Sequence, residues 1–164
     1  MNNKVLFLVI SCVAVAGCAT VSRAPSPPPQ AKEIRSPQQR SEALLVALMA
    51  LGVDYRNGGR SLATGFDCSG LVAHVFEEAY GIRLPRTVLG QSEIGRSVAL
   101  QELEPGDLVF YDTLGRPYSH VGIYIGEDKF VHAPKSGASV RVESLKTSYW
   151  TKRFNGARRV PQAL

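Results

Sequence analysis

The sequence predicts an α+β fold in which N-terminal helices pack on a central antiparallel sheet. Two observations predict it. Apolar residues recur at helical spacing early in the folded part, and short apolar strands separated by turn residues follow later. Helices that precede a run of strands are typical of this class. The chain has 164 residues, 45% hydrophobic and 20% charged, which suits one globular domain and a short leader.

Two helices open the folded part. Ser36 and Pro37 have the pattern of a cap followed by proline in the first helical position, and Gly52 ends this helix. Its buried stripe is expected to consist of Leu44, Leu45, Leu48, Met49 and Leu51.

The second helix is expected to run from Cys68 to Gly81 with Asp67 as its cap. Apolar residues repeat along it at helical spacing: Leu71, Val72, Val75, Phe76 and Ala79. Residues 84–87 then break the chain, and a short helix through Gln91 follows.

The second half of the chain predicts strands. Residues 107–111 are apolar on both faces, which indicates a central strand. Three more strands are expected at 119–125, 130–133 and about 139–144, and a last one at 157–160. Trp150 and Phe154 are expected to close the core.

Residues 1–17 have the pattern of an export signal. Lys4 gives a positive start, and an apolar run of about eleven residues ends at Val15. A spanning helix needs about twenty apolar residues, so this run is too short for one. The run closes on Ala16-Gly17-Cys18, which resembles the lipobox of bacterial lipoproteins. The resemblance implies that Cys18 is acylated and anchors the protein to a lipid bilayer; the alternative is ordinary cleavage to a soluble secreted protein.

Residues 18–36 are expected to form a Pro-rich tether after the acylated cysteine. The segment lacks the apolar content needed to fold, and at about 3.1 Å per residue its roughly eighteen residues reach no more than about 55 Å. Ala19 follows Cys18, where an aspartate would resemble an inner-membrane retention signal. We therefore expect an outer-membrane anchor, with the folded domain facing the periplasm.

The net charge of +5 is mild and mostly scattered, which indicates a solvated surface and argues against a nucleic-acid partner. The chain has three cysteines, and two of them, Cys12 and Cys18, lie in the leader. Cys68 is therefore the only thiol of the folded part, and no internal disulfide can form. A lone thiol is unusual in an exported protein.

Cys68 is a candidate nucleophile because it begins a helix. Unpaired backbone amides and the helix dipole favour negative charge there, so we expect a lowered thiol pKa and a thiolate near neutral pH. The same amides suit the oxyanion of an acyl-transfer intermediate. From this context alone, a buried structural cysteine remains an equal alternative.

A thiol nucleophile needs a base, and the chain has three histidines. His74 lies six positions along the helix from Cys68, about 240° around its axis, and cannot face the thiol. His120 and His132 lie on successive strands. If residues 126–128 form the hairpin loop, Ile125 pairs with Lys129 and both histidines lie on one face of the sheet. A two-residue loop would send them to opposite faces. With both on one face, His120 takes the thiol proton and His132 orients its ring.

Four motifs, in order and at similar spacing, resemble those of the NlpC family, bacterial cell-wall cysteine endopeptidases with a papain-like fold. The motifs are Phe66–Val72, Pro105–Phe110, Ser119–Tyr124 and Phe130–Ala133. The resemblance covers about residues 41–160 and implies that residues 37–164 form the peptidase domain. It implies Cys68 as nucleophile, His120 as base and His132 as orienting residue.

The resemblance also implies further site residues and a substrate. Tyr55 is expected to place its hydroxyl near the thiol or the oxyanion. Asp67 and Ser69 flank the nucleophile, where in some relatives they help to bind the free amine of the peptide; for Asp67 a helix cap is the alternative. The substrates are peptidoglycan stem peptides, cut at the D-isoglutamyl–diaminopimelate or D-alanyl–diaminopimelate bond.

Three other functions remain open from the sequence. Cys68, His120 and His132 are a possible three-ligand zinc set, although paired cysteines and a helical His-Glu-x-x-His are absent from the sequence. The second alternative is a non-catalytic lipoprotein that binds murein or a partner protein. The third is a thiol amidase or acyltransferase. We expect no cofactor, no metal and a monomeric protein.

Overall fold

The computed structural model describes residues 36–161, so the predicted signal 1–17, Cys18 and all of the tether except Ser36 lie outside the described residues. None of the helices in this described range is long and apolar enough to cross a membrane. In chain order the elements are α1 (Pro37–Met49), β1 (Arg60–Ser61), β2 (Gly65–Phe66), α2 (Cys68–Tyr80), α3 (Val88–Ser92), β3 (Arg96–Val98), the 3-10 turn η1 (Leu100–Glu102), β4 (Leu108–Tyr111), β5 (His120–Gly126), β6 (Lys129–His132), β7 (Arg141–Ser144), α4 (Ser148–Thr151) and β8 (Phe154–Arg159).

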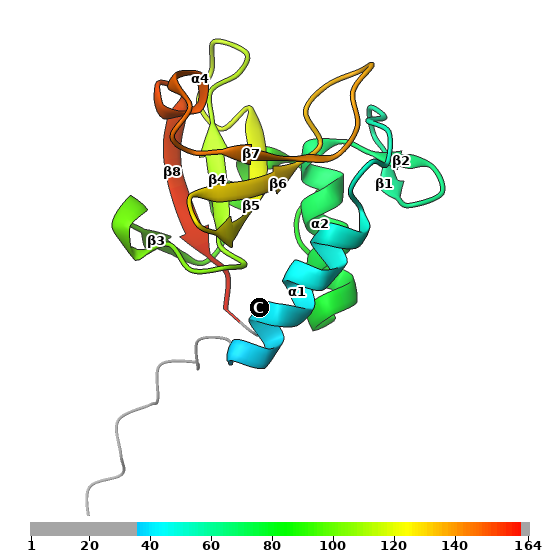
Figure 1. The fold of residues 1–164 in the computed structure, drawn as a ribbon, viewed down its shortest axis with the longest axis horizontal. Coiled ribbons are helices and arrows are strands. Elements are labelled where there is room, and N and C mark those ends of the chain that lie inside the picture. Colours follow the sequence, from blue (N-terminus) through cyan, green and yellow to red (C-terminus); the bar gives the residue numbers. More distant parts are fainter. Residues whose placement is uncertain (1–35, 162–164) are drawn as a thin grey trace, which may run out of the picture. The chain divides into compact units, whose positions relative to one another are not determined.

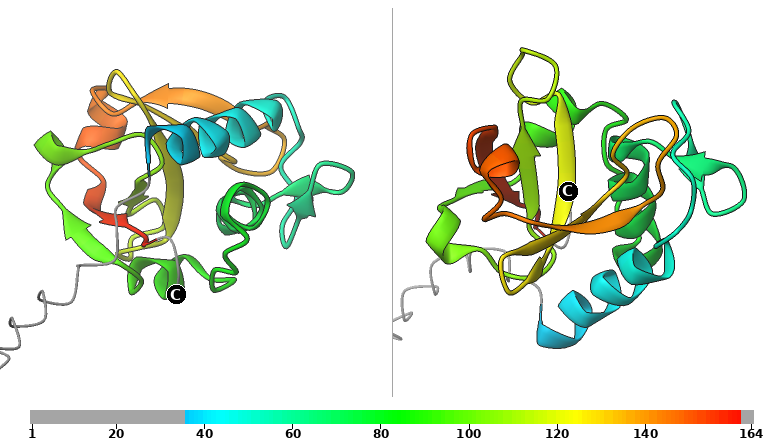
Figure 2. Two further views of the ribbon diagram at one scale, coloured as in Figure 1. Left: turned by 90° about the horizontal axis from the view of Figure 1, so that it is seen from below. Right: turned by 45° about the horizontal axis from the view of Figure 1, so that its top comes forward.

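The strands confirm an α+β fold. Six of them form one antiparallel sheet in the order β3-β8-β4-β5-β6-β7, and α1 and α2 lie along one flank of it (Figures 1 and 2). β4 is buried along its whole length, as expected for a central strand. Its Leu108 and Phe110 side chains join a core shared with both helices, whereas Val109 and Tyr111 join a second core on the opposite face.

The second helix forms as predicted. The Asp67 carboxylate accepts a hydrogen bond from the N–H of Gly70, and Gly81 ends the helix in the left-handed conformation with φ of 66°. Leu71, Val72, Val75 and Phe76 are fully buried, and Ala79 packs at the edge of the same core.

The predicted stripe of α1 is wrong. Ser36 caps this helix in a capping box with Gln39, as its sequence indicates. The fully buried residues, however, are Ala43, Ala47 and Ala50, whereas most of the expected leucines and Met49 are exposed. Because helices approach more closely where the contacting side chains are small, the alanines form the face that packs against α2.

The hairpin of β5 and β6 has a turn that differs from the prediction. We expected residues 126–128 as the loop, with Ile125 opposite Lys129. Instead Gly126 pairs with Lys129, and residues 127 and 128 form a two-residue turn with φ of 50° and 57°. Positive φ at both central residues is typical of a type I′ turn, which matches the twist of the strands. Ile125 is then an extra residue, at which the register shifts.

The bulge at Ile125 restores the predicted register for the rest of the hairpin. Tyr124 pairs with Phe130 and Ile123 with Val131. Continued by one position, this register sets Gly122 opposite His132, as expected. A two-residue turn therefore does not send the two histidines to opposite faces, because the extra residue cancels its effect on the register.

Some strands were not predicted, or were predicted with other bounds. β1 and β2 form a small separate hairpin within the segment before α2, and β3 pairs with β8 at the edge of the main sheet. The last strand, β8, begins earlier than expected and lies inside the sheet between β3 and β4. The loop between β6 and β7 is bound to the chain after α1: the N–H of Val140 donates to the carbonyl of Val53, and the N–H of Gly52 donates to the carbonyl of Val140. These bonds tie the sheet to the helices.

Candidate active site

The Cys68 sulfur lies where the first turn of α2 meets the start of β5. Cys68 is the first residue of α2 and is partly buried. The backbone N–H groups of Ser69 and of Cys68 itself hydrogen-bond to the sulfur from the helix, and the N–H of Val121 does so from β5. Since Val121 directly follows His120, these contacts bring the sulfur beside the strand that carries the expected base.

The thiol of Cys68 is protonated in the free protein. Burial raises its pKa to about 11, with the nearby Asp67 carboxylate as the second cause, while the three N–H groups act in the opposite direction. The expectation of a lowered thiol pKa is therefore wrong for the free protein. The helix start does stabilise the thiolate, but loss of hydration and the negative charge of Asp67 outweigh it.

His120 and His132 meet in direct contact. Nε2 of His120 lies 2.7 Å from Nδ1 of His132, and the two rings are nearly perpendicular, with an interplanar angle of 89°. Both side chains are buried. Trp150, expected only to close the core, stacks on the His120 ring with a centroid distance of 5.6 Å. The His120 ring is thus held by a hydrogen bond at one edge and by an indole on its face.

Burial keeps both imidazoles neutral. It lowers the pKa of His120 to about 4 and that of His132 to about 2, with the charges of His120 and Arg141 as further causes for His132. A neutral imidazole next to a thiol has the protonation state that a general base requires. At rest Cys68 is therefore a protonated thiol and His120 a neutral ring.

The contact between the histidines determines which nitrogen can act. With Nε2 of His120 bound to His132, the nitrogen left for a thiol proton is Nδ1. For Nδ1 to accept that proton, Nε2 must carry the hydrogen of His120 and donate it to Nδ1 of His132. The hydrogen of His132 then lies on its own Nε2, a buried atom without a hydrogen-bond partner among the described residues.

This geometry does not suit a shared zinc ion. Zinc–nitrogen bonds are about 2.0–2.1 Å, and two ligands in tetrahedral positions stand more than about 3 Å apart, whereas these two nitrogens are separated by 2.7 Å. Across residues 36–161 there is no group of three His, Cys, Asp or Glu side chains arranged to hold a metal ion.

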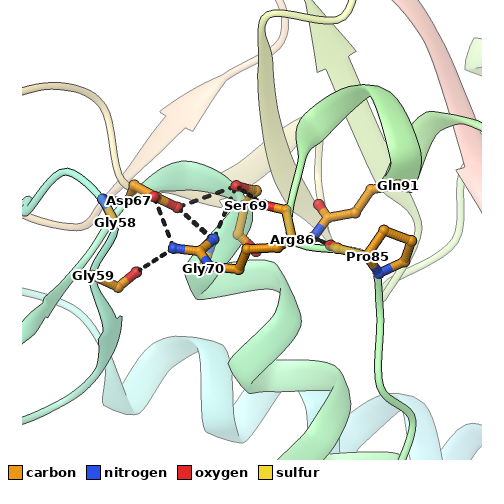
Figure 3. Close-up of polar contacts among 8 residues, drawn as sticks. All are labelled: Gly58, Gly59, Asp67, Ser69, Gly70, Pro85, Arg86 and Gln91. Atoms are coloured by element: carbon orange, nitrogen blue, oxygen red, sulfur yellow. Dashed lines mark hydrogen bonds and ion pairs between the residues drawn. The ribbon is translucent and has the colours of Figure 1, made fainter.

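Arg86 joins the residues that flank the nucleophile, a role that the sequence analysis missed. Its Nη1 and Nη2 atoms lie 2.9 and 2.8 Å from the two oxygens of Asp67 (Figure 3). Nη1 also donates to the Ser69 hydroxyl, and Nη2 donates to the carbonyl of Gly59. A bidentate pair of this kind fixes both position and orientation.

Asp67 therefore makes a full set of contacts before any substrate arrives. Besides Arg86, its carboxylate accepts from the N–H groups of Gly58 and Gly70 and from the Ser69 hydroxyl. These contacts fit the helix-cap alternative. An amine of the substrate would have to compete with Arg86 for the same oxygens, so the amine-binding role of Asp67 and Ser69 stays a prediction.

Gly70 is required by the close approach of two segments. A Cβ atom at this position would overlap the carbonyl oxygen of Gly59 and would press on Arg86 and Asp67. The missing side chain lets the loop before β1 contact the first turn of α2, and Arg86 fastens that contact through Gly59.

Tyr55 lies on the same side of the site. It forms a parallel bridge with Phe66, two residues before Cys68. Burial raises the pKa of its phenol, and the charges of Cys68 and Asp67 raise it further. The phenol is therefore neutral and its charge state is coupled to that of Cys68, and the placement of its hydroxyl near the thiol or the oxyanion stays a prediction.

Comparison with known proteins identifies the family of this chain. Residues 52–159 match the NlpC/P60 family. The chain belongs to this family. An Escherichia coli protein of the family, named "Probable endopeptidase NlpC", is 36% identical over 159 residues, which cover 93% of this chain and 97% of the relative. Membership confirms the resemblance and the fold class predicted from the motifs.

Other NlpC/P60 relatives are larger than this chain. "Murein DD-endopeptidase MepS/Murein LD-carboxypeptidase" of Escherichia coli is 49% identical over 109 residues, 66% of this chain and 56% of the relative. "Murein DD-endopeptidase MepH" of the same organism is 41% identical over 116 residues, 69% of this chain and 43% of the relative. The chain thus spans about half the length of these two proteins.

The solved structures of NlpC/P60 proteins share the fold. A Staphylococcus aureus protein described as similar to a lipoprotein of this family aligns with a TM-score of 0.70 and 32% identity, over 80% of this chain and 44% of that one. The NlpC/p60 domain of the peptidoglycan hydrolase SagA aligns with a TM-score of 0.63 and 29% identity, over 73% of this chain and 97% of that domain.

Proposed function

We propose that this protein is a cysteine endopeptidase that hydrolyses peptide bonds in peptidoglycan stem peptides. One observation carries the proposal: a thiol at a helix start lies beside the strand of a buried, neutral histidine whose ring is held by a second histidine at 2.7 Å. Relatives named as murein endopeptidases support the substrate class.

The reaction begins with proton transfer from Cys68 to Nδ1 of His120. The sulfur attacks the scissile carbonyl, and backbone N–H groups at the start of α2 receive the developing oxyanion. The protonated His120 then gives its proton to the leaving amine. Nδ1 of His132 accepts a hydrogen bond from Nε2–H of His120 throughout, and so holds the His120 ring in the tautomer that the first step needs.

The second half of the reaction releases the product. Water, deprotonated by His120, attacks the thioester on Cys68. The C–S bond breaks, the new carboxyl group is released, and His120 returns the proton to the sulfur. In this proposal Tyr55 donates a hydrogen bond to the sulfur or to the oxyanion, and the influence of the Cys68 charge on its phenol supports that role. The bond that is cut is D-isoglutamyl–diaminopimelate or D-alanyl–diaminopimelate.

Defined muropeptides test this function. The protein and its Cys68→Ala variant are incubated with monomeric and crosslinked peptides, and the fragments are weighed by mass spectrometry. Cleavage by the wild type that is lost in the variant supports the proposal, and the fragment masses identify the bond. Peptides that stay intact but bind the protein would instead indicate a murein-binding lipoprotein.

We further propose that the domain is anchored to the outer membrane through an acylated Cys18 and faces the periplasm. The lipobox pattern and the Pro-rich segment that follows it support the proposal. A tether of at most about 55 Å would keep the domain near its membrane. Metabolic labelling with a fatty acid is expected to mark the wild type and not a Cys18→Ala variant, which would fractionate as soluble protein; equal labelling of both would contradict the anchor.

A further inference from the structure

A cavity of about 540 Å³ opens beside His120, and none of the residues that line it belongs to α2. His120 and Trp150 form its inner wall, and Lys135, Arg141, Glu143 and Tyr149 are among the residues that line the rest. Cys68, Asp67 and Arg86 do not belong to its lining, so the cavity is separate from the cluster of Figure 3.

The position of this cavity relates it to one half of the substrate. This step rests on the proposed function. The general acid must lie next to the amine that leaves, because proton transfer requires hydrogen-bond reach. The residue that carries the leaving amine is therefore bound beside His120, and His120 is part of the wall of this cavity.

The charges of the cavity favour an anion. Nε of Arg141 donates to Glu143 at 2.8 Å, so these two charges largely compensate one another. Lys135 is exposed and makes no ion pair or side-chain hydrogen bond within the described part of the chain. The cavity thus contains one cation that no protein group among the described residues neutralises, and Arg141 is part of the same lining.

We propose that this cavity binds a free carboxylate on the leaving-group residue, with Lys135 as its main partner and Arg141 as the second. Diaminopimelate has a carboxylate of this kind. At either of the two candidate bonds the leaving residue is diaminopimelate, and the carboxylate at its D-configured centre is not part of a peptide bond. Lysine at the same place in a stem peptide lacks this carboxylate, and amidation removes its charge.

The test compares two muropeptides that differ only in this group, one with the free diaminopimelate carboxylate and one with its amide. We expect the wild type to cleave the free acid with a kcat/KM about twofold to fivefold higher, as one ion pair at an exposed site gives. Lys135→Gln is expected to lose this preference through slower cleavage of the free acid alone. Lys152→Gln, an exposed lysine outside the lining, is the matched control and should keep it.

Binding to Cys68→Ala protein provides a readout that does not depend on hydrolysis. Calorimetry should show tighter binding of the free acid than of the amide, and Lys135→Gln in the same background should abolish the difference. Equal affinities in the Cys68→Ala protein, or a preference that survives Lys135→Gln, would overturn the carboxylate site. Failure of the wild type to cleave either peptide would contradict the proposed function instead, and the binding comparison would still decide the inference.

Discussion

Replacing His132 should slow catalysis without unfolding the protein. In His132→Leu, Nε2–H of His120 loses its acceptor at 2.7 Å in a buried position, which costs about 1–3 kcal/mol. The ring of His120 also loses the contact that fixes its tautomer, and removal of an orienting residue can cost up to about 10⁴ in rate. We therefore expect kcat to fall about 10²–10³-fold, equivalent to about 3–4 kcal/mol of transition-state stabilisation, with KM little changed.

The structure supplies a matched pair of controls. Oδ1 of asparagine is attached to Cγ as Nδ1 of histidine is, so His132→Asn keeps an acceptor at nearly the same place. The carbonyl of glutamine lies one bond farther out. We expect activity to follow the order wild type, Asn, Gln, Leu. The free energy of unfolding of His132→Leu should change by less than about 1 kcal/mol, because the substitution also removes the unpaired Nε2–H of His132.

The assay is steady-state cleavage of a defined muropeptide, with chemical denaturation of each variant beside it. Leucine and asparagine variants of equal activity would refute the orienting role of His132. A leucine variant that loses stability in proportion to its activity would show instead that the histidine is needed for folding.

Three further predictions concern stability, each measured by chemical denaturation. Arg86→Met should lower the free energy of unfolding by about 2 kcal/mol, because it leaves the mostly buried Asp67 carboxylate without its ion pair. Arg83→Met, which breaks an exposed ion pair, should lower it by less than about 0.5 kcal/mol. Equal losses would contradict the stabilising role of the Arg86–Asp67 pair. Ala47→Leu should cost about 1–3 kcal/mol through overpacking and Leu48→Ala almost nothing, the reverse of the result that a buried leucine stripe would give. Below pH 6.5 His120 becomes protonated in the unfolded chain, whereas in the folded protein it stays neutral to about pH 4. As the pH falls through this range, the free energy of unfolding should therefore decrease by about 1.4 kcal/mol per pH unit more in the wild type than in His120→Gln. Parallel pH curves would contradict a buried neutral ring.

Much of the fold follows from local signals in the sequence. The second helix has a capping aspartate, a terminal glycine and an apolar repeat that all agree, and its ends lie where they were predicted. The buried face of the first helix was predicted wrongly because this helix has apolar residues on more than one face. Hydrophobicity alone favours leucine for the core, but packing two helices closely favours alanine, and that choice depends on a partner helix that the local sequence does not specify.

The site was partly predictable for similar reasons. The cysteine at a helix start and the histidines on one hairpin follow from local spacing, and the register was right although its turn was wrong. A two-residue turn with a bulge at Ile125 gives the same register as a three-residue loop without a bulge, and the sequence alone does not distinguish the two. The raised thiol pKa and the Arg86 cluster depend on burial and on contacts between residues far apart in the chain. Such contacts leave no local pattern.

Mass spectrometry of the protein quenched with acid during turnover tests the central chemistry most directly. A nucleophilic Cys68 should appear with the acyl part of the muropeptide attached as a thioester, on the proteolytic fragment that contains it and on no other. Wild-type protein that stays unmodified while it turns over substrate, together with a Cys68→Ala variant that cleaves at the same rate, would contradict the mechanism.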